Sequence, residues 1–147
     1  MAVTDAQLRE ILTRSPTIAV LGIHSRPEKA ACYVPEYLRD VGYRVLGVNP
    51  VFADQTLLGA PVRARLAELT EPVDLVDVFR RGEHLPAHVE DLLAMKPRPR
   101  VVWFQLGIRN DEVASILVAA GITVIQSRCM LADHQRLGLG APQAQGR

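Results

Sequence analysis

The sequence is poor in cysteine, has almost no net charge and contains no long apolar run. Cys32 and Cys129 are the only two cysteines in 147 residues. They are too few for a disulfide framework and lack metal-ligand spacing, so we expect a reduced, cytoplasmic protein without a metal site. No apolar stretch approaches the roughly 18 residues needed to span a bilayer, which argues against a membrane partner. A net charge of +1 argues against a general nucleic-acid binder, which needs a concentrated basic face.

The composition is that of an ordinary globular domain. Hydrophobic residues make up 48% and charged residues 22% of the chain, which excludes a disordered protein. The length fits one domain, which we place at residues 1–137. Residues 138–147 are rich in Gly, Ala and Gln and are predicted to form a flexible tail.

Short apolar runs alternate with segments of helical periodicity along the whole domain. Thr4 and Gln7 form a predicted capping box that begins an opening helix. Residues 51–61 are interpreted as a loop and 63–69 as a short helix at best. The predicted strands are 17–21, 43–48, 73–79, 101–106 and 122–125. The later predicted helices are 29–41, 86–95, a helix capped by Asn110 and ended by Gly121, and 129–136.

This alternation predicts an α/β fold, a doubly wound parallel five-stranded sheet of the Rossmann-like type. We predict the strand order 3-2-1-4-5, with a switch point between the first and fourth strands. Ligands of such sheets bind beyond the carboxyl ends of the strands. The five strand ends should therefore surround one crevice.

Residues 17–29 read T-I-A-V-L-G-I-H-S-R-P-E-K and form the most informative stretch. A buried strand runs into a turn at Gly22, and a helix follows at once. Backbone N–H groups and the positive end of a helix make such a turn a ready anion site, to which Arg26 and Lys29 add formal charge. The stretch therefore predicts a phosphate-bearing ligand.

A nicotinamide dinucleotide is the first alternative for such a sheet. The fingerprint G-x-G-x-x-G is absent, because His24 stands where the second glycine would be. The acidic residue expected after the second strand is replaced by Asn49 and Pro50. Both features count against an NAD(P)-dependent redox protein, which remains an alternative.

Several stretches together resemble the small stand-alone CoA-binding-domain proteins, which are similar to the CoA-binding domain of the succinyl-CoA synthetase α subunit. They are V-L-G-I-H-S-R-P-E-K, Y-V-P-E-Y-L, G-Y-R-V-L-G-V-N-P, D-V-F-R-R, Q-L-G-I-R and S-R-C-M-L-A-D-H. The resemblance covers roughly residues 5–137. It implies binding of coenzyme A or an acyl-CoA and names no established reaction.

The resemblance also implies where coenzyme A lies. The turn after the first strand would hold the phosphates, with Arg26 and Lys29 on the 3′-phosphate or pyrophosphate. The second strand end would border adenine and ribose, the third would line the crevice, and the last two would face the pantetheine arm. His24 departs from the family, which often has a small residue there, and would crowd the turn or donate to a phosphate. The implied residues are Gly22, Ile23, His24, Ser25, Arg26, Lys29, Val48, Asn49, Pro50, Phe79, Arg80, Gln105, Gly107, Ile108, Arg128 and Cys129.

No catalytic constellation emerges from the sequence, so we expect a binding module rather than an enzyme. Cys129 and His134 are five residues apart and would not face each other on a helix. Asp77 interrupts an apolar strand, and we expect loop amides to satisfy its carboxylate by hydrogen bonding. A partner-dependent subunit of an acyl-CoA ligase remains a further alternative, with an unidentified protein partner.

Overall fold

The computed structural model describes residues 3–143, which form a parallel five-stranded sheet between two layers of helices. The sheet strands are β1 (Thr17–Leu21), β2 (Arg44–Val48), β5 (Leu75–Val78), β6 (Val101–Phe104) and β7 (Thr123–Ile125). The α-helices are α1 (Asp5–Thr13), α2 (Ala30–Asp40), α3 (Val89–Ala94), α4 (Asp111–Ala119) and α5 (Met130–Arg136). A small hairpin of β3 (Thr56–Leu57) and β4 (Ala60–Pro61) follows β2, and the 3₁₀ helices are η1 (Pro50–Phe52), η2 (Leu66–Glu68) and η3 (Gly82–His88).

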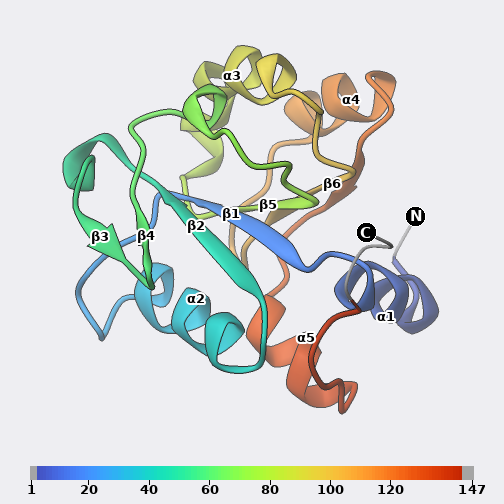
Figure 1. Cartoon of the computed structure of the whole chain (residues 1–147). Coiled ribbons are helices and arrows are strands. Elements are labelled where there is room, and N and C mark those ends of the chain that lie inside the picture. Colours follow the sequence, from blue (N-terminus) through green and yellow to red (C-terminus); the bar gives the residue numbers. More distant parts are fainter. Residues whose placement is uncertain (1–2, 144–147) are drawn as a thin grey trace.

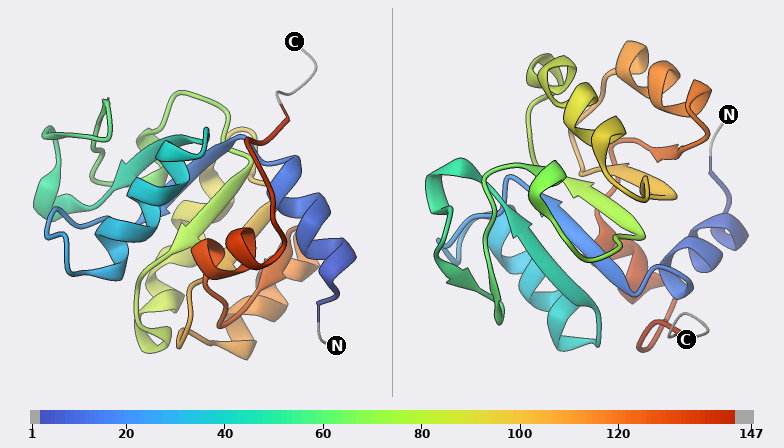
Figure 2. Two further views of the ribbon diagram at one scale, coloured as in Figure 1. Left: turned by 90° about the horizontal axis from the view of Figure 1, so that it is seen from below. Right: turned by 45° about the horizontal axis from the view of Figure 1, so that its top comes forward.

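Each face of the sheet carries its own hydrophobic core. Helices α3 and α4 cover one face, and α1, α2 and α5 cover the other (Figure 1; Figure 2). Successive strand residues alternate between the two cores: Ile18 and Val20 enter the α2 side, and Ala19 and Leu21 enter the α3 side. Burial on both faces explains why β1 and β5 are nearly continuous apolar runs. The predicted doubly wound fold is confirmed.

The predicted strand order is wrong in one respect. The observed order is β2-β1-β5-β6-β7, so the third sheet strand lies between the first and the fourth rather than outside the second. The link between β2 and β5 contains only short elements, and its Ala60 and Leu66 join the core on the α3 side. This link therefore crosses over that face of the sheet and passes β1. As a result β5, whose residues are all buried, is the middle strand of the sheet. The switch point lies between β1 and β5 rather than between the first and fourth strands.

Local signals were reliable for most elements. Thr4 and Gln7 form both hydrogen bonds of the capping box, at 3.1 and 2.8 Å. Asn110 caps α4 as predicted, with its side chain accepting from the Val113 amide. The predicted helix 86–95 is instead η3 followed by α3, because Pro86 lacks the amide hydrogen of a regular helix. The β3–β4 hairpin replaces part of the predicted loop 51–61.

The last described residues run back over the body of the protein. The Gln143 amide donates to the Thr13 carbonyl at 2.8 Å, and the His134 ring bonds the Gly140 carbonyl at 3.0 Å. Residues 144–147 of the predicted tail lie outside the described residues.

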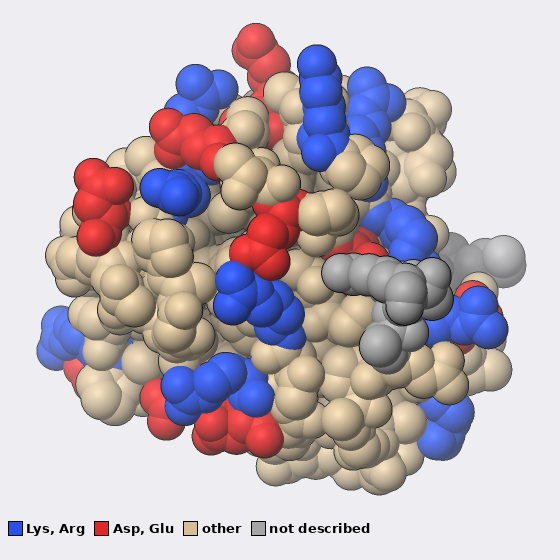
Figure 3. Space-filling view, viewed as in Figure 1, with Lys and Arg blue, Asp and Glu red and all other residues tan. Residues whose placement is uncertain are grey.

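The surface mixes charges of both signs. On the face drawn in Figure 3, basic and acidic side chains are interspersed, without one broad patch of either sign. In the described part of the chain, no helix is long and apolar enough to cross a membrane.

Candidate functional site at the carboxyl ends of the strands

Gly22 ends β1 at the point where three strands meet. Its amide donates to the Val48 carbonyl at 2.8 Å, and the Phe79 amide donates to the Leu21 carbonyl at 2.9 Å. Gly22 has φ of +90°, and a Cβ there would lie 2.9 Å from the Phe79 carbonyl oxygen. Both the backbone angle and the close approach of β5 therefore require glycine. The predicted turn residue thus stands at the observed switch point.

The loop after Gly22 is held by bonds of its own. The His24 amide donates to the Ala31 carbonyl at 3.1 Å, and the Arg26 amide donates to His24 Nδ1 at 3.1 Å. Nδ1 accepts in this bond, so the ring carries its hydrogen on Nε2 when neutral. The ring also meets Phe52 edge-on, with centroids 5.1 Å apart. The His24 ring therefore packs against η1, and the His24 and Arg26 amides are both already bonded within the loop.

Two exposed cations stand at this loop and at the start of α2. Lys29 is exposed and occupies the N-cap position of α2. Arg26 pairs with Glu28 at 2.7 Å, and the two side chains are 66% and 58% exposed. Exposed ion pairs of this kind contribute little to stability. Arg26 and Lys29 can therefore exchange solvent or Glu28 for a ligand phosphate, in the positive field of the helix start.

Three predicted residues at the first two strand ends face inward. Ile23 and Val48 are 1% and 0% exposed, and their side chains belong to the two cores. Asn49 Nδ2 donates to the Ile23 carbonyl at 2.9 Å, and Asn49 Oδ1 accepts from the Val51 amide at 3.0 Å. Asn49 therefore links the loops after β1 and β2 from inside the protein. Pro50, the next residue, is exposed.

Buried polar atoms without partners gather at the ends of β5 and β6. Gln105 is 5% exposed, and its Oε1 accepts no hydrogen bond from residues 3–143. Arg80 Nε is likewise buried without a partner in this part of the chain. Native proteins leave few such groups unsatisfied. These two predicted residues lie at the ends of neighbouring strands, with Phe79 directly before Arg80.

Asp77 corrects an expectation drawn from the sequence. Both carboxyl oxygens are fully buried, and no described residue donates to them, so the expected bonds from loop amides are absent. Burial raises the pKa of Asp77 well above its usual range. Its register places it beside Trp103 of β6, inside the core on the α2 side.

The last two predicted segments pack together, and one of their charges is already paired. The Gly107 amide donates to Ser127 Oγ at 3.1 Å, and the Ser127 amide donates to the Ile108 carbonyl at 3.1 Å. The Arg128 guanidinium makes two hydrogen bonds to Asp133, at 2.8 and 2.9 Å. Arg128 therefore joins α5 to the sheet and offers no free charge, while Cys129 lies half-buried at the N-cap of α5.

Sequence reasoning missed the exposed apolar side chains of this edge. Val51 is 74% exposed just after β2, Leu106 is 67% exposed just after β6, and Tyr33 is 48% exposed in the first turn of α2. Leu106 and Tyr33 follow strand and helix patterns and Val51 begins a predicted loop, so nothing in the sequence marked these three as exposed residues of one edge. Large exposed apolar groups at strand ends suit a ligand with an apolar body.

The parallel order with a switch between β1 and β5, together with a glycine turn there, defines a Rossmann-like α/β protein. The comparison with known families is more specific. The chain belongs to the CoA binding domain family, whose model matches residues 16–135.

Relatives of known sequence or structure agree with this family. The chain is 37% identical to the uncharacterised protein YneT of Bacillus subtilis over 131 residues, covering 89% of this chain and 94% of the relative. A solved structure from Thermus thermophilus is 47% identical with a TM-score of 0.88, covering 92% of this chain and 99% of that one. An acetyl-coenzyme A synthetase 1 from Candidatus Korarchaeum cryptofilum is 17% identical with a TM-score of 0.63, covering 78% of this chain and 26% of that protein. This last likeness shows a shared fold.

Proposed function

We propose that this protein binds coenzyme A, free or acylated, across the carboxyl ends of its strands, and that it acts by binding rather than by a reaction of its own. The observation that carries the proposal is the pair of exposed cations, Arg26 and Lys29, beside the Gly22 turn of a CoA-binding-domain chain.

Phosphates belong at the first loop. Arg26 and Lys29 flank the start of α2, an 11-residue helix whose N-terminal dipole favours negative charge. The absence of a side chain at Gly22 lets β5 approach the backbone of β1, and the chain then turns toward the two cations. A 3′-phosphate and a pyrophosphate would both find formal charge there.

The apolar and amide parts of the ligand belong further along the edge. Val51 offers an exposed apolar surface for the adenine ring, and Leu106 offers one for the pantetheine arm. Gln105 Oε1 is an unpartnered acceptor among the described residues, suited to an amide N–H of that arm. Arg80 Nε is the complementary unpartnered donor, suited to a carbonyl or phosphate oxygen.

Calorimetric titration with CoA, dephospho-CoA, ATP and NADH tests the proposal. We expect CoA to bind more tightly than the other three, because only CoA combines the 3′-phosphate with a pantetheine arm. Arg26→Ala and Lys29→Ala should each weaken CoA binding about tenfold, the loss of one charged phosphate contact. Dephospho-CoA should be affected much less if these side chains hold the 3′-phosphate.

Arg39→Ala is the matched control, because Arg39 lies in the last turn of the same helix and pairs with Asp40. Its affinity for CoA should stay that of the wild type. Equal losses for CoA and dephospho-CoA would move Arg26 and Lys29 to the pyrophosphate. Saturable NADH binding without any CoA binding, in protein checked for co-purified ligand, would overturn the proposal in favour of a nicotinamide cofactor.

A further inference from the structure

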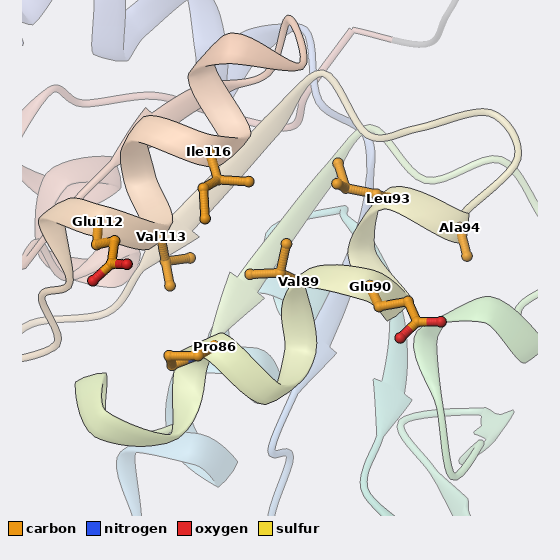
Figure 4. Close-up of a pocket in the computed structure, with 8 residues that line it drawn as sticks. All are labelled: Pro86, Val89, Glu90, Leu93, Ala94, Glu112, Val113 and Ile116. Atoms are coloured by element: carbon orange, nitrogen blue, oxygen red, sulfur yellow. The ribbon is translucent and has the colours of Figure 1, made fainter.

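An apolar groove runs between α3 and α4, on the far side of the sheet from α2. It has a volume of about 700 Å³ and is lined by Pro86, Val89, Glu90, Leu93, Ala94, Glu112, Val113 and Ile116. Val89 and Leu93 of α3 point toward Val113 and Ile116 of α4, whereas the carboxylates of Glu90 and Glu112 point away to the rim (Figure 4). The groove therefore has an apolar floor and an acidic border.

One end of the groove adjoins the proposed CoA site. Helices of a parallel α/β sheet begin at the edge where the strands end, so η3 and α4 start beside Arg80 and Gln105. Ile108, in the loop after β6, packs on the same core as Val113 of α4. Asn110 joins the loops after β5 and β6, because its side-chain Nδ2 donates to the Gly82 carbonyl at 2.9 Å while its side-chain oxygen caps α4. A hydrocarbon chain that extends from the pantetheine end of the ligand along Leu106 and Ile108 would next reach Pro86 and Val113.

We propose that this groove holds the hydrocarbon chain of an acyl-CoA, an inference that rests on the proposed function. Its volume and apolar lining are those of a small-molecule site. The rim carboxylates of Glu90 and Glu112 disfavour a second carboxylate nearby. The ligand class is therefore a CoA thioester of a neutral, medium-length acyl chain, and not of a dicarboxylic acid.

A second copy of the protein is the competing occupant, and two side chains of α4 separate the cases. Ile116 is 44% exposed and lines the groove, whereas Val118 is 58% exposed on the same helix and does not line it. Of these two residues, an acyl chain would contact only Ile116, because Val118 faces another side of the helix. A docked copy would also cover Ile116, but it would make the wild type a dimer.

The test is calorimetry of the full chain with CoA, octanoyl-CoA and succinyl-CoA, on the wild type and on Ile116→Asp and Val118→Asp. We expect octanoyl-CoA to bind at least about tenfold more tightly than CoA, because its methylenes are removed from water. Succinyl-CoA should bind no more tightly than CoA. Ile116→Asp should remove the octanoyl advantage and leave CoA affinity unchanged, and Val118→Asp should change neither.

Equal affinities of wild-type protein for CoA and octanoyl-CoA would overturn the inference and leave the proposed function standing. Failure to bind CoA at all would instead remove the proposed function on which it rests. Analytical ultracentrifugation of the same samples measures the oligomeric state and so tests whether a second copy occupies the groove. A wild-type dimer that Ile116→Asp dissociates and Val118→Asp does not would assign the groove to self-association and overturn the acyl-chain site.

Discussion

Asp77 lies on the central strand β5 between Val20 of β1 and Trp103 of β6, and its carboxyl group is fully buried. No residue in the described range 3–143 donates a hydrogen bond to it. A buried carboxylate without partners is costly, so the group stays protonated and its pKa is raised well above the usual range. This single residue makes the free energy of unfolding depend on pH.

The sign of that dependence follows from proton binding. The unfolded chain releases the Asp77 proton above a pH of about 4, whereas the folded protein keeps it until a much higher pH. The stability that Asp77 contributes is therefore fullest below about pH 4 and falls as pH rises toward the folded pKa. Relative to the wild type, Asp77→Asn, which cannot ionise, should gain free energy of unfolding as pH rises from about 4 to about 7.5.

Urea denaturation of both proteins across this pH range measures the effect. Asp40→Asn is the control, because Asp40 is exposed on α2 and should show almost no change. A stability difference for Asp77→Asn that is the same at every pH would mean that the Asp77 carboxyl does not titrate differently on folding.

At the scale of the element, Asn110 serves two structures at once. Its oxygen accepts from the Val113 amide at 3.0 Å and caps α4, and its Nδ2 donates to the Gly82 carbonyl at 2.9 Å. The sequence predicted the cap from residue type and position alone. The bond to Gly82 joins the loops after β6 and β5, and only their approach in space creates it.

Substitution of Asn110 separates these two roles. Asn110→Ala should lower the free energy of unfolding by about 2 kcal/mol, through loss of the cap and of one further buried bond. Asn110→Asp keeps the capping oxygen and loses only the donor to Gly82, so its loss should be smaller. Chemical denaturation measures both losses, provided that the dependence of the unfolding free energy on denaturant concentration is the same as in the wild type. Equal losses for the two variants would show that the cap contributes nothing.

The elements also show which charges are available. Arg128 and Arg26 looked alike in the sequence, as arginines just after predicted strands. In the structure Arg128 is bound by the buried Asp133 on α5, whereas Arg26 pairs with the exposed Glu28. Asp133 is five residues from Arg128 across a helix start, and no helical spacing rule pairs the two.

For the whole molecule, ligand binding and folding are linked. Any ligand that binds only the folded state stabilises it by about 2.7 kcal/mol at one hundred times its Kd. For a chain of this length we expect saturating CoA to raise the Tm by about 8 °C. Differential scanning calorimetry measures the shift, which Arg26→Ala should reduce at the same CoA concentration and Arg39→Ala should not. A Tm unaffected by CoA would speak against binding to the folded state.

How much of the molecule could be predicted follows from the range of the interactions. The helix starts at Thr4 and Asn110, the Gly22 turn and the alternation of strands with helices depend on residues close in sequence, and these predictions are confirmed. The family resemblance is confirmed as well. For the ligand site, the sequence predicted the strand ends as its place but could not rank the side chains there.

The amino-acid sequence alone was enough to define most of the secondary structure and the α/β class, because helix caps, glycine turns and apolar periods act over a few residues. The tertiary structure alone decided the position of β5 beside β1, since that depends on how the β2–β5 link packs across a whole face of the sheet. It also decided that Asn49 and Arg128 are internally bonded, that Gln105 and Arg80 keep unpartnered atoms among the described residues, and that α3 and α4 enclose an apolar groove. Most of these depend on contacts between residues far apart in the chain, and the Arg128–Asp133 pair depends on how the chain turns into α5.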